Sequence, residues 1–69
     1  MSREPLLNFV KGQGDLVLSL QMSDVYAPPI TGEYVFIANQ RYHVKSVSSH
    51  LSPEGQGDMF IYLEEATAN

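Results

Sequence analysis

The sequence predicts a small all-β protein, folded as a five-stranded barrel or as a strongly bent antiparallel sheet. Three observations support this class. The tetrapeptide Gly-Gln-Gly-Asp occurs twice, at Gly12–Asp15 and at Gly55–Asp58, and each copy runs into an apolar stretch. Apolar residues in the first of these stretches alternate with other residues, which is typical of a strand with one buried face. Two more alternating segments, Tyr34–Ala38 and Arg41–Lys45, flank a short turn and predict a β-hairpin.

The N-terminal part is expected to form two strands joined by the first glycine turn. The apolar residues of Leu6–Val10 fit a strand, and they also fit one helical turn ended by Gly12. We favour the strand, because the same tetrapeptide follows a predicted hairpin later in the chain. Glycine adopts positive φ without steric cost, so both copies are predicted to be turns that lead into the strands Leu16–Leu20 and Met59–Leu63. In the strand after the first glycine turn, the residues predicted to share the core face are Leu16, Leu18, Leu20 and Met22.

The middle of the chain is predicted to hold a connection and a two-faced hairpin. Ser23–Gly32 contains two adjacent prolines, so it reads as an extended connection that closes in a turn. With the hairpin turn placed at Asn39 and Gln40, the predicted cross-strand pairs are Ile37 with Tyr42, Val35 with Val44, Phe36 with His43, and Tyr34 with Lys45. Val35, Ile37, Tyr42 and Val44 would then form the apolar inner face.

The spacing of apolar residues changes after this hairpin. The next apolar residue after Val44 is Val47, three positions on, which predicts a bulge near Lys45 and Ser46. A bulge there would help a short sheet to curl. Ser52–Gly55 is predicted to be the last loop, and Ala66–Asn69 a frayed tail.

Length, charge and cysteine content limit the protein class. The 69 residues predict one domain over 1–69, with a thin core that self-association would help to stabilise. The absence of cysteine excludes disulfides and is compatible with the cytoplasm, where we expect the protein. A net charge of -4 disfavours nucleic acid and anionic membrane surfaces. The sequence offers no apolar run long enough for a membrane span, so no membrane contact is expected.

Catalytic, metal and cofactor sites are not predicted. The glycine turn at residues 12–14 precedes an aspartate and a strand, whereas a phosphate loop needs a helix N-terminus. The two histidines, His43 and His50, without cysteine fall short of the three or four ligands that zinc requires. The hydroxyls of Ser48 and Ser49 adjoin His50, but neighbours in a strand point to opposite faces. We therefore expect no enzyme.

The hairpin and the last strand carry apolar residues on both faces, and this doubly apolar character needs a cover. The predicted interaction face consists of Tyr34, Phe36, Arg41, His43, Lys45, Phe60 and Tyr62. One interpretation is that barrel closure or the Leu6–Val10 segment covers its rings. Otherwise a protein covers them, either a second copy in a homodimer or a different protein. The sequence thus predicts a non-enzymatic protein-interaction or assembly module. The alternative is weak binding of single-stranded nucleic acid, with Tyr34 and Phe36 stacking on bases and the three basic residues near phosphates.

Residues Pro29–Val47 show a resemblance to a known family. Their pattern is Pro-x-x-Gly-Glu-x-Val-x-Ile followed by Tyr-x-Val-x-x-Val. This pattern resembles the strand, turn and strand of small Src-homology-three-like barrels in uncharacterised bacterial and phage proteins. The resemblance implies the fold and transfers no binding or catalytic residue. Peptide-binding members of that class use an aromatic groove, and this chain has no tryptophan to anchor a ligand there.

Overall fold

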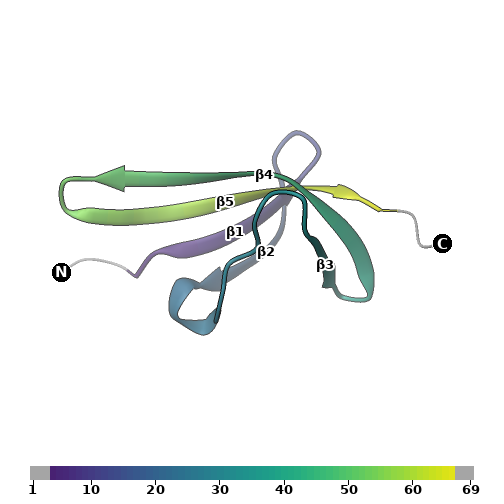
Figure 1. Cartoon of the computed structure of the whole chain (residues 1–69), viewed down its shortest axis with the longest axis horizontal. Coiled ribbons are helices and arrows are strands. Elements are labelled where there is room, and N and C mark those ends of the chain that lie inside the picture. Colours follow the sequence, from purple (N-terminus) through teal and green to yellow (C-terminus); the bar gives the residue numbers. More distant parts are fainter. Residues whose placement is uncertain (1–3, 67–69) are drawn as a thin grey trace.

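The structure is a computed structural model that describes residues 4–66. Its elements are β1 (Leu6–Lys11), β2 (Asp15–Gln21), the 3-10 turn η1 (Met22–Asp24), β3 (Tyr34–Ile37), β4 (Gln40–Ser52) and β5 (Gly55–Glu65). The strands form one sheet in the order β2-β1-β5-β4-β3. This sheet curls through 249° as a half-barrel (Figure 1). The expected all-β, strongly bent five-stranded fold is confirmed.

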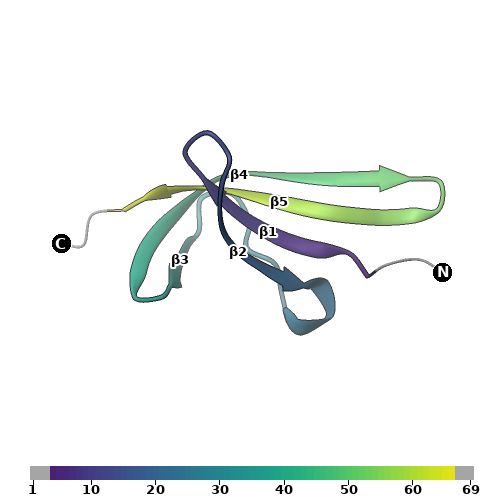
Figure 2. The ribbon, with the colours of Figure 1, turned by 180° about the vertical axis from the view of Figure 1, so that it is seen from behind.

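Strand β1 lies inside the sheet, between β2 and β5, and is buried on both faces. Its strand conformation confirms that Leu6–Val10 does not form a helical turn. It pairs antiparallel with β2 and parallel with β5, whereas the other pairs are antiparallel. The sheet is therefore mixed, and not antiparallel throughout as the sequence predicted, because the parallel β1–β5 pair joins the hairpin β1–β2 to the meander β3–β4–β5 (Figure 2).

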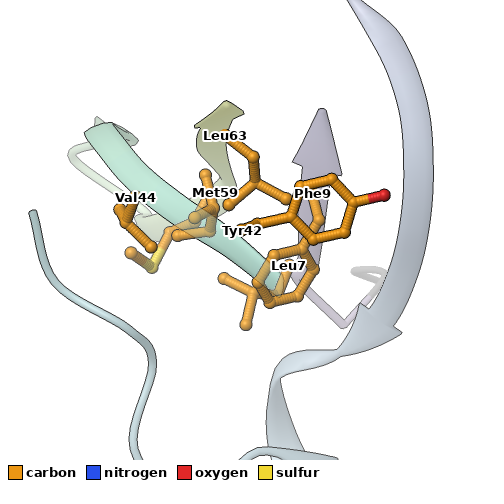
Figure 3. Packing of buried hydrophobic residues seen from close by; sticks show 7 residues of the cluster. Leu7, Phe9, Tyr42, Val44, Met59 and Leu63 are labelled. Atoms are coloured by element: carbon orange, nitrogen blue, oxygen red, sulfur yellow. The ribbon is translucent and has the colours of Figure 1, made fainter. Parts of the chain in front are cut away.

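The core occupies one face of the curled sheet, which we call the inner face. Figure 3 shows its buried side chains packed together from β1, β4 and β5. They are Leu7, Phe9, Tyr42, Val44, Met59, Ile61 and Leu63. Partly buried residues from β2, β3 and the connection between them pack against this cluster, among them Leu18, Met22 and Val35. The opposite face is called the outer face.

The β3–β4 hairpin turns one residue earlier than predicted. Its turn residues are Ala38 and Asn39, with φ of 51° and 68°, and Ile37 pairs with Gln40. Two central residues with positive φ give a tight turn whose twist matches that of the strands. The pairing consequently slips by two residues, so the predicted cross-strand partners are wrong. A slip of two keeps each side chain on its face, and the predicted division into faces is right.

A bulge in β2 moves one predicted core residue to the outer face. Phe9 pairs with Leu18 and Val10 pairs with Leu16, so Val17 is the extra residue in the ladder. Because strand residues alternate between faces, this insertion reverses Leu16, which is 62% exposed. The expectation that Leu16 faces the core is therefore wrong, and it is right for Leu18.

The two Gly-Gln-Gly-Asp copies adopt different structures. The first forms the β1–β2 turn, with φ of 60° at Gly12 and 109° at Gly14. The second lies within β5, because the turn is made by Pro53 and Glu54 just before it. The prediction of a second glycine turn is thus wrong, although the last loop is placed correctly.

Three other expectations concern the connections and the chain end. The ladder of β4 and β5 shifts between Val44 and Ser46, which confirms the bulge. The connection after η1 has no strand and closes in a turn at Gly32, as expected. Of the predicted tail, Ala66 donates its amide to the carbonyl of Arg41 at 3.0 Å, and residues 67–69 lie outside the described residues.

Candidate functional site on the outer face

Four of the seven predicted face residues gather at the end of the sheet formed by β3 and β4. Tyr34 and Phe36 alternate along the edge strand β3 and point to the outer face. Tyr34 pairs with His43, and Phe36 pairs with Arg41. We call this group, Tyr34, Phe36, Arg41 and His43, the aromatic end. Its two rings are well exposed, with Phe36 at 72% and Tyr34 at 53%.

The side chains of the aromatic end hold one another in place. The guanidinium carbon of Arg41 lies 4.0 Å from the centroid of the Tyr34 ring, in cation–π contact. The His43 ring lies 5.1 Å from the same ring, tilted by 48°. The cation–π contact is worth about 0.5–1 kcal/mol at an exposed site. Tyr34 is therefore fixed between two basic side chains, while Phe36 projects at the edge.

Carboxylates accompany the basic side chains of this region. His43 Nδ1 lies 2.9 Å from Glu64 Oε2, in a hydrogen bond across β4 and β5. Glu65 Oε2 accepts a hydrogen bond from Lys11 Nζ at 3.3 Å. A shallow hollow of about 460 Å³ is lined by Tyr34, Arg41, His43, Glu64, Glu65 and Ala66. The two carboxylates of this hollow would repel an anion, so the basic side chains alone do not make it an anion-binding site.

Lys45 does not join the aromatic end. The sequence paired it with Tyr34, but His43 takes that place and Lys45 falls in the bulge of β4. There it lines a separate hollow of about 340 Å³, whose lining residues are Lys11, Gly12, Asp15, Lys45, Leu63, Glu64 and Glu65. The three basic residues predicted to act together are thus divided between two hollows.

Phe60 and Tyr62 lie on the outer face of β5, in the middle of the sheet. Phe60 is flanked by Asn8 on β1 and Ser48 on β4, and it is half-buried. The ring of His50 meets it edge-on at 5.4 Å. Tyr62, two residues on, is 39% exposed. Glu64 follows on the same face and is hydrogen-bonded to His43, so Glu64 lies between the two rings and the aromatic end.

An apolar groove on the inner side escaped the sequence analysis. It has a volume of about 430 Å³ and is lined by Pro28, Pro29, Ile30, Thr31, Val47 and Met59. The adjacent prolines and the apolar residue after them were visible in the sequence as a connection. Their position beside Val47 depends on the path of that connection across the sheet, which the sequence does not show.

Neither a search for other kinds of site nor a comparison with known proteins assigns a function to the chain. Within residues 4–66, no three side chains of metal-binding types gather closely enough to hold a metal ion. No helix in the same residues has the length and apolar character needed to cross a membrane. The chain matches no family model, no curated protein and no solved structure. Its function must be inferred from its own surfaces.

Proposed function

We propose that the chain is a non-enzymatic protein-interaction module that binds a protein, in the first place a second copy of itself, through the aromatic end. The observation that carries this proposal is the exposure of Phe36 and Tyr34 side by side, with Arg41 held over the Tyr34 ring. Tyrosine and arginine are enriched among the residues that dominate binding energy in protein interfaces. A fixed ring also loses little conformational freedom on binding.

The exposed ring area suits a contact of this kind. A Phe or Tyr residue buries about 150–250 Å² in a protein interior, so the exposed fractions leave roughly 200–300 Å² uncovered at Phe36 and Tyr34. Together the two rings approach the size of the largest apolar patch on a typical monomer, about 300–600 Å², and such a patch is often functional. A thin core gives the chain a further reason to associate, because a partner that binds the folded state stabilises it.

The alternative of single-stranded nucleic acid has less support. Glu64 and Glu65 line the same hollow as Arg41 and His43, and Lys45 lies elsewhere. Phosphate groups would meet these carboxylates and the net charge of -4. A protein partner requires no such concentration of positive charge.

The non-enzymatic part of the proposal rests on the chemistry of the hollow. His43 and Glu64 are hydrogen-bonded, as in many acid–base pairs. Among residues 4–66, those that line this hollow include no serine, threonine or cysteine that such a pair could activate. A relationship to Src-homology-three-like barrels of bacterial or phage origin remains part of the proposal, and the half-barrel is compatible with it.

The test compares two substitutions of exposed aromatic residues by glutamate. Phe36→Glu places a charge in the aromatic end, whereas Tyr26→Glu makes a similar change in the fully exposed loop after η1. Sedimentation at about 10–100 μM covers the range of modest interfaces. We expect Phe36→Glu to weaken association at least tenfold and Tyr26→Glu to leave it unchanged. If both variants and the unchanged chain associate equally strongly, the proposal is contradicted.

A further inference from the structure

Strands β4 and β5 continue past the rest of the sheet as a two-stranded ribbon. Figure 1 shows them running to a hairpin far from β3, and the molecule is 45 Å long in its longest dimension. β3 pairs with β4 only from Gln40 to His43, and the connection reaches Val44 through the amide of Gly32. Among the described residues, Val47–Ser52 of β4 pairs only with β5. The other edge of this segment receives no backbone hydrogen bond from the described residues, and we call it the open edge.

The open edge lacks the side chains that usually protect sheet edges from pairing with another chain. Such protection comes from lysine, from proline or from charges that face inward. Residues 46–52 contain no aspartate, glutamate, lysine or arginine. The chain as a whole carries a net charge of -4, so two copies repel each other at long range. Contact at this edge brings no formal like charges together.

The apolar groove lies directly beside the open edge, because Val47 belongs to both. The β4 strand is regular from Val47 to Leu51, since the second ladder irregularity places its extra residue in β5, between Gln56 and Met59. Val47, Ser49 and Leu51 therefore share the inner face. Leu51 is 76% exposed at the distal end of the ribbon.

We propose that a second copy of the chain adds its Val47–Leu51 segment antiparallel to this open edge, about a two-fold axis at Ser49. In this register each Val47 faces the Leu51 of the other copy, and each Leu51 enters the other copy's groove. A two-fold axis at Ser48 would instead place Val47 opposite Ser49 and leave the groove without an apolar side chain. The contact is self-complementary, as a two-fold interface must be.

This contact uses a different surface from the aromatic end, so each of the two proposals can be tested and refuted without the other. The ribbon supplies backbone hydrogen bonds along one strand and one leucine for each groove. When a strand is added to a sheet edge, the backbone hydrogen bonds usually give affinity and the side-chain pockets give specificity. The interface is small by the standard of about 800 Å² per partner, and we expect a weak dimer.

A single cysteine tests the register, because the chain has none of its own. Residues directly opposite in antiparallel strands have Cα atoms about 4.5–5.5 Å apart, within the range of about 4.4–6.8 Å that a disulfide spans. Ser49→Cys places a thiol on the proposed axis. Ser46→Cys is the matched control, since Ser46 is also exposed on β4 but would lie about 20 Å from its counterpart.

We expect mild oxidation at about 50 μM, within the range of weak interfaces, to convert Ser49→Cys to a covalent dimer at least tenfold faster than Ser46→Cys. Equal rates, or no dimer from either variant, would overturn the proposal. Circular dichroism of both variants checks that they are folded.

The role of the groove is tested in the Ser49→Cys background. Leu51→Glu should slow cross-linking at least tenfold, whereas Leu16→Glu, an equivalent change at another exposed leucine, should not. Equal slowing by both changes would overturn the assignment of Leu51 to the groove. Phe36→Glu in the same background should leave the rate unchanged, and a matching loss would show that cross-linking depends on the aromatic end instead.

Discussion

Ile61 lies fully buried at the centre of β5, and its substitution tests whether the inner face forms the stabilising core. It is 0% exposed and pairs with Phe9 on one side and Val47 on the other. Removing one buried methylene by Ile61→Val costs about 0.5–1.5 kcal/mol, and Ile61→Ala costs about 2–5 kcal/mol. A domain below 70–80 residues rarely gains more than about 3–5 kcal/mol from its core. We therefore expect Ile61→Val to fold and Ile61→Ala to be largely unfolded.

Urea unfolding followed by circular dichroism measures this difference. With a slope near 1 kcal/mol per molar urea, Ile61→Val should lower the midpoint by about 0.5–1.5 M. The control is Ile30→Val, the same change at a residue that is 64% exposed, which should alter stability by less than about 0.5 kcal/mol. Low protein concentration keeps association from adding to stability. Equal midpoint shifts for the two variants, or a stable Ile61→Ala, would refute the assignment of the core.

Three further predictions follow from the outer face and the N-terminal segment. Phe60→Ala should destabilise the fold by about 1–3 kcal/mol in urea unfolding, because the ring is half-buried, yet leave association per folded molecule unchanged; a weaker association of the folded protein would place the ring in the interface. Hydrogen bonds from the Ser23 side chain and backbone hold the pKa of Glu4 below its ordinary value of 4.5, so their contribution to stability is present above pH 4.5 and is lost as the pH falls through the lower pKa of the folded state. The stability difference between the unchanged chain and Glu4→Gln should accordingly shrink on acidification, and a difference that does not vary with pH would contradict this. A labelled single-stranded oligonucleotide should show no binding even at about 50 mM salt, whereas binding that weakens steeply by about 200 mM and is lost in Arg41→Ala plus Lys45→Ala would support the nucleic-acid alternative.

Local patterns predicted the strands and most of their faces. The alternation in Tyr34–Ala38 and Arg41–Lys45 identified both strands of the hairpin, and the irregular spacing between Val44 and Val47 identified the bulge. These features depend on residues close together in the chain. They are therefore readable from the sequence without knowledge of the rest of the fold.

Features set by pairing with distant segments were not predictable. The second Gly-Gln-Gly-Asp forms strand because Leu51 pairs with Gln56, and Gly57 fits there because a Cβ atom would lie 3.3 Å from the carbonyl oxygen of His50. Leu16 turns outward because of a bulge relative to β1. The local sequence pattern shows neither the pairing of β5 with β4 nor that of β2 with β1.

The candidate site was predicted only in part, because its composition also depends on strand pairing. The alternation placed Tyr34, Phe36, Arg41 and His43 on one face, and the structure brings them together. The hairpin register decided that Lys45 is excluded, and a turn at Ala38 and Asn39 was not expected because alanine rarely adopts positive φ. The groove beside Val47 depends on tertiary packing alone.

Self-association is the central claim, and sedimentation equilibrium of the unchanged chain tests it most directly. We predict that the weight-average mass rises from the 7.7 kDa of one chain toward twice that value or more as the concentration increases from about 1 to 100 μM. A mass that stays at 7.7 kDa throughout this range would contradict both proposed contacts between copies, and it would leave a different protein as the partner of the aromatic end.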